Sequence, residues 1–220
     1  MNPNKNNSLY GIFTNKITSK KLVFYPCPKN ANSSAKLFFA KHIGIDNKFL
    51  FLSDKIPEYK LSNNDFLEKT NLTNFLPVKQ PFAKMPDDYL KCCIVRDPIK
   101  RFVSAYKNRV MYHKDEAFKN HSVDEVIKKL KEDKFENLHF LPQSFFLGND
   151  LKYFDYCHDV SELKEFEKDI NSFFKKTVSF PKIQTGGSEI NLELTKDQVE
   201  NLKEIYFNDF IMIKSKKNIR

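Results

Sequence analysis

Two short stretches of the sequence carry side chains that are suited to holding an anion. In the first, PKNANSS (residues 28–34), Lys29 and the hydroxyl groups of Ser33 and Ser34 lie at the start of an expected helix. The unpaired N–H groups and the dipole of a helix N-terminus favour negative charge, and the lysine adds a point charge. The pattern therefore predicts a site for a phosphate or sulfate group.

The second stretch, RDPIKRFVSAY (residues 96–106), has Arg96 eight residues before Ser104. On a helical wheel Arg101 and Ser104 fall on the side opposite the apolar residues. An alternative interpretation makes Arg101 the i,i+4 ion-pair partner of Asp97 and leaves Ser104 as an ordinary surface hydroxyl. Anion sites after two different strands indicate a nucleotide that carries phosphates at two separate places.

Each stretch follows an expected buried strand. Residues 21–26 and 90–95 are short apolar runs of the kind found in strands that are covered on both faces. Asp97 is a favoured helix N-cap, and Pro98 suits the first helical position. Arg96 is thus expected at the carboxyl end of a strand, where open α/β sheets bind their ligands.

Strands and helices alternate along the rest of the chain. The patterns predict helices over 32–44, 122–133, 161–174 and 195–210, strands over 151–157 and 177–180, and a loop with aromatic anchors over 137–148. Capping boxes start two of the helices, Ser122 with Glu125 and Thr195 with Gln198. We expect residues 1–20 to be loosely held and residues 45–89 to form an irregular insertion. The alternation predicts a parallel sheet covered on both faces.

The composition limits the classes of protein. The 220 residues suffice for one large α/β domain, residues 1–220. No apolar run approaches the roughly 18 residues of a membrane span, and the polar start lacks the core of a secretory signal, so we expect a soluble cytoplasmic protein. Four cysteines without CxxC spacing predict buried free thiols and no metal site: Cys27, Cys92, Cys93 and Cys157.

The net charge of +9 favours an anionic ligand or partner, such as a nucleotide, an acidic glycan or a nucleic acid. The chain has no RNA-binding signature, and its aromatic residues lie mostly in apolar runs, which disfavours nucleic acid. A P-loop nucleotide kinase is a further alternative, but the pattern G-x-x-x-x-G-K-[ST] needs glycines, and none occurs between Gly11 and Gly44.

The two stretches together resemble the cofactor motifs of sulfotransferases that use 3′-phosphoadenosine 5′-phosphosulfate, PAPS. PKNANSS is similar to their 5′-phosphosulfate loop, and RDPIKRFVSAY is similar to their 3′-phosphate motif, R-D-P-x-x-R-x-x-S-x-Y. Later segments resemble the carbohydrate sulfotransferase group, family 2, most closely: HFLPQSFFL (139–147), FDYCHDVSEL (154–163) and LTKDQVENLKEIYFNDFIMI (194–213). The first loop departs from many relatives at Asn30 and Asn32, where small residues or glycine are common.

The resemblance implies a P-loop-NTPase-like, three-layer α/β fold with a central parallel sheet flanked by helices. It implies in-line transfer of a sulfuryl group from PAPS to an acceptor hydroxyl, with 3′,5′-ADP as the product and no metal. The implied acceptor is a carbohydrate, on a glycan or glycolipid, while a small metabolite or a peptide tyrosine stays open. Nucleic acid is not among the expected partners.

The resemblance also implies roles for particular residues. Lys29 would bind the bridging oxygen of the donor and stabilise the leaving phosphate. Backbone N–H groups from Asn30 to Ser34 would hold the 5′ end, and Arg96 and Ser104 would hold the 3′-phosphate. The complete expected 5′ site comprises Pro28, Lys29, Asn30, Ala31, Asn32, Ser33 and Ser34. The segment QTGGS, with Gly186, Gly187 and Ser188, would close over the nucleotide or form an ordinary glycine turn.

An acceptor hydroxyl needs a general base, and we expect His139 in this role. His113 could edge the acceptor cleft, and the carboxylates of Glu58 and Asp65 are alternative bases. The histidines at helix ends are expected to be structural: His42 and His121. A protein that binds PAPS without turnover also stays open, because the base is the least defined of these residues.

Overall fold

The computed structural model of the chain describes residues 8–9, 11–14, 18–42, 77–78, 88–182, 187 and 189–216. Most of the expected insertion of residues 45–89 lies outside these ranges, and so do Glu58, Asp65, Gly186 and Ser188.

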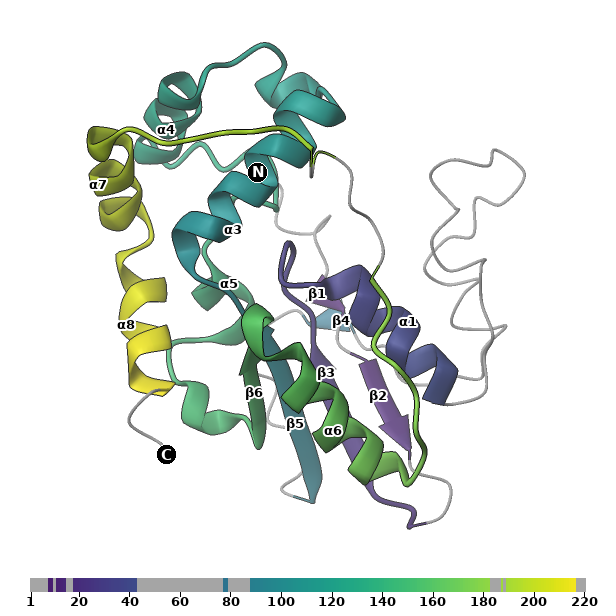
Figure 1. Ribbon diagram of the computed structural model, residues 1–220. Coiled ribbons are helices and arrows are strands. Elements are labelled where there is room, and N and C mark those ends of the chain that lie inside the picture. Colours follow the sequence, from purple (N-terminus) through teal and green to yellow (C-terminus); the bar gives the residue numbers. More distant parts are fainter. Residues whose placement is uncertain are drawn as a thin grey trace.

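A four-stranded sheet forms the centre of the molecule (Figure 1). In spatial order its strands are β2 (Gly11–Thr14), β3 (Lys21–Tyr25), β5 (Tyr89–Val95) and β6 (Tyr156–Asp159). Strands β3, β5 and β6 run parallel, as the alternation of strands and helices predicted. A separate pairing joins β1 (Ser8–Leu9) to β4 (Pro77–Val78).

The edge strand β2 adds one antiparallel pair to the predicted parallel sheet. It pairs with β3, with Gly11 opposite Phe24 and Thr14 opposite Lys21. This short strand lies within residues 1–20, for which the sequence predicted no regular element. A four-residue strand carries little signal of its own, and it is held by ladder hydrogen bonds to a neighbour that only the tertiary structure brings near.

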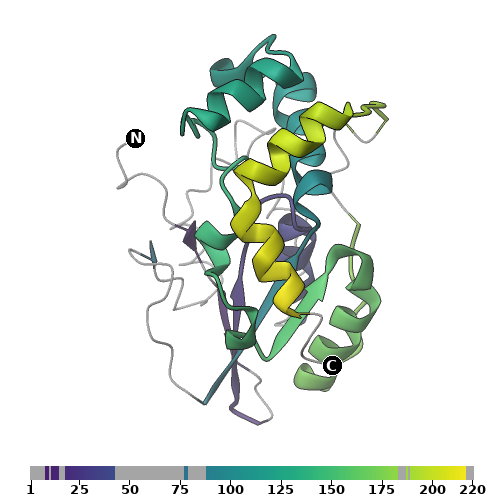
Figure 2. The same ribbon diagram turned by 90° about the vertical axis from the view of Figure 1, so that its left-hand side faces the viewer.

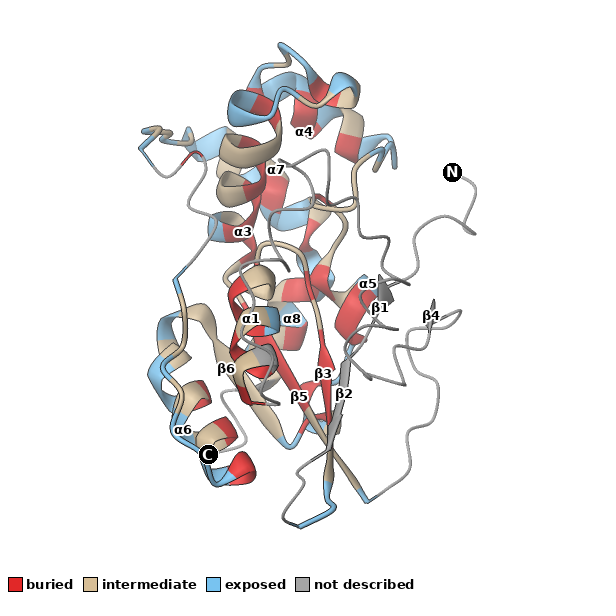
Figure 3. Ribbon diagram, turned by 90° about the vertical axis from the view of Figure 1, so that its right-hand side faces the viewer, coloured by how far each residue is buried: buried red, intermediate tan, exposed pale blue. Residues whose placement is uncertain are grey.

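Helices cover both faces of the sheet and give the predicted three layers (Figures 1 and 3). The covering helices are α1 (Asn32–His42), α5 (Gln143–Leu147), α6 (Leu163–Phe174) and α8 (Phe207–Lys216). Leu22 and Phe24 of β3 pack with α1 and α6 on one face. Val23 and Tyr25 pack with α5 and α8 on the other, because successive side chains of a strand point to opposite faces. Figure 2 shows α8 in front of this second face.

A third group of helices stands above the carboxyl ends of the parallel strands (Figure 1). It consists of α3 (Pro98–Ala105), η4 (Tyr106–Tyr112), η5 (Glu116–Phe118), α4 (Val123–Lys131) and α7 (Lys196–Ile205). Both predicted capping boxes are present, at the starts of α4 and α7. Asp97 caps α3 as expected, with its side chain accepting from the N–H of Lys100 at 2.9 Å.

The sequence pattern suggested a regular α-helix through and after the arginine motif, but the helix is irregular. From Tyr106 to Tyr112 it is a π-helix, and the N–H of His113 donates to the carbonyl oxygen of Asn108, five residues earlier. Such π-turns within helices are rare and often occur at functional sites.

The predicted strand over 177–180 is wrong. The side chain of Asn171 on α6 bonds both the N–H and the carbonyl oxygen of Val178, each at 3.1 Å. The carboxylate of Glu167 accepts from the N–H of Phe180 at 2.6 Å. These side chains take the place of a neighbouring strand, while Val178 and Phe180 still pack against the core. The apolar pattern of this segment therefore reflects packing on a helix.

Three further boundaries differ from the expectation. The loop over 137–148 contains the short helix α5. The strand expected over 151–157 begins only at Tyr156, after the 3-10 turn η6 (Leu151–Tyr153). The helix expected over 195–210 is interrupted at Tyr206, whose buried hydroxyl donates to the carbonyl oxygen of Phe140 at 2.8 Å.

The last residue of α1 makes folding stability dependent on pH. His42 is buried, stacks on Phe174 with ring centroids 4.6 Å apart, and contacts Phe38 edge-on. Burial lowers the pKa of His42 to about 4, because the charged imidazolium loses its hydration.

We predict that His42→Phe flattens the acid side of the stability curve. The neutral ring is favoured by the fold, so its contribution is present above the unfolded pKa near 6.5 and is lost as pH falls through about 4. Urea unfolding between pH 7 and pH 4 should show the wild type losing more free energy of unfolding than the variant. Equal losses in the two proteins would contradict the assignment.

Candidate active site

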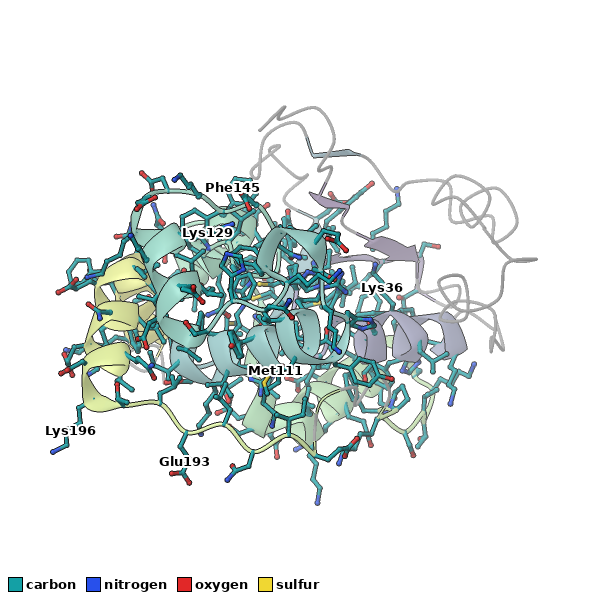
Figure 4. All side chains as sticks on the ribbon, turned by 90° about the horizontal axis from the view of Figure 1, so that it is seen from above. Lys36, Met111, Lys129, Phe145, Glu193 and Lys196 are labelled. Carbon is teal, nitrogen blue, oxygen red and sulfur yellow. The ribbon has the colours of Figure 1, made fainter. Side chains whose placement is uncertain are left out.

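The two anion-binding stretches lie at the same edge of the sheet. Because β3 and β5 are parallel neighbours, the loop before α1 and the start of α3 lie side by side (Figure 1). Nη1 of Arg96 donates to the carbonyl oxygen of Lys29 at 3.0 Å, which joins them directly. Figure 4 looks down on this edge, with Lys36 marking α1 and Met111 marking the end of η4. The stretches are therefore two parts of one site.

The loop between β3 and α1 adopts a left-handed backbone at two residues that are not glycine. The angle φ is +69° at Lys29 and +56° at Ala31. Such conformations cost about 1–3 kcal/mol each and cluster at ligand-binding sites. The N–H of Asn30 donates to the carbonyl oxygen of Cys27 at 3.2 Å, so this group is turned inward. The expectation that all N–H groups from Asn30 onward hold the ligand is wrong at this residue.

Arg101, on α3, is bonded to the backbone of the same loop. It is 1% exposed, and its Nε and Nη1 donate to the carbonyl oxygens of Pro28 and Leu141 at 2.9 and 2.7 Å. Arg101 is therefore neither on a polar, exposed helix face, as the helical wheel predicted, nor the ion-pair partner of Asp97, as the alternative interpretation required. The helical wheel fails here because the loop and the segment after α4 cover that face of α3.

Asn30 and Gln143 form a buried pair behind the loop, with 1% and 0% exposure. Nδ2 of Asn30 donates to Oε1 of Gln143 at 2.6 Å and to the carbonyl oxygen of Ile94 at 2.8 Å. Asn30 thus faces the protein interior, which explains an asparagine where small residues are common. Gln143 was not among the predicted site residues, although it is the last residue of the HFLPQ segment.

The electrostatic environment of Lys29 suits an anion. Burial lowers the pKa of Lys29 to about 8, and Arg96 and Arg109 add to the shift. Arg101 contributes in the same direction. At neutral pH the lysine is still mostly charged, and a bound anion would raise its pKa again, since opposite charge favours the charged form.

His139 lies in the loop before α5 and is held in one tautomer. Oδ1 of Asn137 accepts from the backbone N–H of His139 at 2.9 Å, and Nδ2 of Asn137 donates to Asp115 at 2.6 Å. These partners fix which end of the amide is the oxygen. Nδ1 of His139, 2.8 Å from that oxygen, must therefore carry the proton, which leaves Nε2 as an acceptor.

The same cations act on His139. Burial lowers the pKa of His139 to about 3, with further lowering by Arg109 and Lys29, and then by Arg101 and His113. The ring is therefore neutral at physiological pH and able to accept a proton. The negative charges of a bound nucleotide would offset these cations and raise the pKa toward the range that suits a general base.

Arg109 is a site residue that the sequence analysis missed. Its Nε donates to Asp115 at 2.7 Å, which connects it through Asn137 to His139. In an unbroken α-helix Arg109 would lie about 80° around the axis from Arg101. The π-helix holds more residues in each turn and so reduces this angle. A helical wheel of constant period could not find this residue.

The remaining predicted residues take various positions. Ser33 is half-buried and Ser34 is buried in the first turn of α1, which begins at Asn32, and Ser104 is half-buried on α3. Gly187 is buried with φ of +82°, and a Cβ there would lie 2.8 Å from the carbonyl oxygen of Lys107. Gly187 therefore packs against the backbone of η4.

The other histidines are placed away from this chemistry or at its rim. His113 is exposed and contacts the ring of Tyr112 edge-on. His121 contacts the carbonyl oxygen of Lys119 through Nδ1 at 3.1 Å, and His158 pairs with Asp169 at 2.8 Å. The four cysteines are free thiols, and Cys27, Cys92 and Cys93 are buried as expected. Cys157 is only half-buried, so the prediction of a buried thiol is wrong there.

The side chains of the site fit a donor that carries several negative charges. Its four cationic groups are Lys29, Arg96, Arg101 and Arg109. The Nη2 atom of Arg101 is buried without a hydrogen-bond partner within the described part of the chain. Burial also lowers the pKa of Arg96, which shows that part of its charge is withdrawn from water. Among the described residues no three His, Cys, Asp or Glu side chains are grouped as metal ligands.

Comparison with known proteins defines the class. A sequence model of the sulfotransferase family matches residues 15–212, which include both anion-binding stretches and all the parallel strands. The chain therefore belongs to the sulfotransferase family, and the resemblance to its family 2 is confirmed. No curated protein and no solved structure gives a significant match. Within the described ranges, no helix has the length and apolar character to cross a membrane.

We predict that Gly187→Ala destabilises the protein by about 1–3 kcal/mol, because the left-handed backbone and the contact with Lys107 leave no room for Cβ. Chemical unfolding measures the loss. Glu193→Ala, an exposed change in the following segment (Figure 4), is the control. A Gly187→Ala protein as stable as that control would show that the segment does not need glycine here.

Proposed function

We propose that this sulfotransferase moves a sulfuryl group from PAPS to a hydroxyl group of a carbohydrate. The observation that carries the proposal is the cluster of Lys29, Arg96 and Arg109 at one sheet edge, of which Lys29 and Arg109 also act electrostatically on His139. A donor with phosphates at both ends of a nucleoside would engage the loop before α1 and the start of α3 together.

The donor would be held by residues with different tasks. PAPS supplies an activated sulfuryl group, whose transfer releases 3′,5′-ADP. Lys29 and the N-terminal turn of α1 would hold the 5′ end, and the lysine would stabilise charge that develops on the leaving phosphate. Arg96, with Ser104, would hold the 3′-phosphate. Arg101 acts differently, since its bonds to backbone carbonyl groups position the loop.

The acceptor would be activated by His139. Its Nε2 is the acceptor nitrogen, and Asn137 keeps the proton on Nδ1. A hydroxyl placed against Nε2 could pass its proton there as its oxygen forms the new bond to sulfur. Asp115 and Arg109 hold Asn137 in turn, so the orientation of the base depends on a chain of three bonds of 2.8, 2.6 and 2.7 Å.

The transferred group needs charge stabilisation and alignment, as in phosphoryl transfer. The cationic side chains of the site supply both, so the proposed mechanism includes no metal. The carbohydrate acceptor is supported by the resemblance to the carbohydrate group of family 2 and by the net charge of +9, which suits an acidic glycan.

We predict that the protein binds 3′,5′-ADP more tightly than 5′-AMP, and that Arg96→Ala removes this preference. Charge-assisted hydrogen bonds contribute about 1.5–3 kcal/mol, so the variant should lose about tenfold to hundredfold in affinity for 3′,5′-ADP. Calorimetric titration with 3′,5′-ADP, 5′-AMP and Mg-ATP measures this.

Lys100→Ala is the matched control for Arg96→Ala, because it removes one positive charge from an exposed position four residues away. It should change the affinity little. A wild-type protein that binds 5′-AMP or Mg-ATP as tightly as 3′,5′-ADP would overturn the donor assignment and favour a nucleotide kinase.

We predict that His139→Ala abolishes turnover but leaves the affinity for 3′,5′-ADP within about threefold, because RT ln 3 is small beside a phosphate contact. In the wild type, NMR titration should place the pKa of His139 near 3 without ligand and higher with 3′,5′-ADP bound. His121→Ala serves as the control and should keep turnover. Full activity of His139→Ala would exclude His139 as the base.

A further inference from the structure

The side chain of Gln143 contacts both anion-binding segments. Its Oε1 accepts from Nδ2 of Asn30 at 2.6 Å and from the backbone N–H of Arg96 at 3.0 Å. Its Nε2 donates to the carbonyl oxygen of Arg96 at 2.8 Å. Both partners of Oε1 are N–H donors and the partner of Nε2 is a carbonyl group, so the orientation of the amide is fixed.

At Arg96 this amide holds the backbone between two elements. Arg96 lies after the last residue of β5 and before the first turn of α3, outside both elements. Gln143 bonds both the N–H and the carbonyl group of this residue, and an unpaired buried group there would cost about 1–3 kcal/mol. The bonds therefore set the direction in which the Arg96 side chain leaves the backbone.

At Asn30 the same amide holds the loop before α1. Asn30 lies between the two residues with positive φ, Lys29 and Ala31. Its side chain is tied to Gln143 and to the carbonyl oxygen of Ile94 in β5. The strained turn is therefore secured at its centre, where Lys29 must be presented to the donor.

Gln143 is itself firmly anchored. Its backbone N–H donates to Oδ2 of Asp209 at 2.7 Å, and the N–H of Ser144 donates to Oδ1 at 2.8 Å. Asp209 is fully buried on α8. This carboxylate lies at the N-terminus of α5, where both free N–H groups and the helix dipole favour negative charge. Helix α8 thus provides a fixed support from which Gln143 reaches the sheet edge.

We propose that Gln143 is a positioning residue that aligns the 5′ and 3′ phosphate sites together. This inference rests on the proposed donor, whose two phosphate-bearing ends bind at these two segments. Gln143 acts through Asn30 and Arg96 and need not touch the nucleotide. Its loss should weaken both sites.

The test compares four ligands: 3′,5′-ADP, 5′-AMP, 3′-AMP and adenosine. The ratio of affinities for 3′,5′-ADP and 5′-AMP gives the contribution of the 3′-phosphate, and the ratio for 3′,5′-ADP and 3′-AMP gives that of the 5′-phosphate. Gln143→Met keeps the length of the side chain and removes all three bonds. We expect both ratios to fall about tenfold, while adenosine binds within about threefold of the wild type.

Phe145→Met is the matched control. Phe145 is exposed on the same helix, and the substitution introduces the same methionine side chain (Figure 4). It should leave both ratios unchanged. Ratios for folded Gln143→Met that match the wild type, or a fall in only one ratio, would overturn the inference. A wild-type protein without preference for 3′,5′-ADP would instead count against the proposed function, so the two failures are distinguishable.

A measurement on the unaltered protein covers the case in which Gln143→Met does not fold. The side-chain NH2 resonances of Gln143 can be followed by NMR while 5′-AMP or 3′-AMP is added. We expect each ligand alone to shift them, because each occupies a segment bonded to this amide. Shifts with only one ligand, or with neither, would contradict a shared positioning role.

Discussion

Backbone carbonyl groups held by the guanidinium groups of buried Arg101 and half-buried Arg96 are the constraint on which the candidate site depends. Arg101 bonds the carbonyl oxygen of Pro28, and Arg96 bonds that of Lys29. These two bonds fix the loop that carries Lys29 and precedes α1. The left-handed backbone at Lys29 is unfavourable on its own, and it persists because the surrounding bonds over-determine it.

The concentration of positive charge has a second consequence. Burial lowers the pKa values of Lys29 and His139, and the cations that would attract a nucleotide lower them further. The negative charges of a bound nucleotide would offset the effect of these cations, so the pKa of His139 would rise when the donor is bound. Donor binding and the basicity of His139 would thereby be coupled electrostatically.

Where local signals were strong, the fold could be predicted closely. The strands before both motifs, the Asp97 cap and the capping boxes of α4 and α7 all depend on residues within a few positions of one another. Predictions failed where the bonding partner lies outside the local pattern. Residues 177–180 have the composition of a strand, but side chains of the preceding helix α6 bond their backbone. Arg101 has the position of a polar surface residue, but a loop 73 residues away in sequence covers it.

The sequence by itself determined the α/β class and the family and singled out the two candidate anion-binding stretches, because residue types at fixed short spacing carry that information. Only the tertiary structure decided how these stretches meet. The roles of Gln143 and Asp209 depend on bonds between segments that are far apart in the chain, and the position of Arg109 depends on a π-helix that changes the helical period. A hydrogen bond is specific in direction and distance, so its partners are defined only once the backbone is placed.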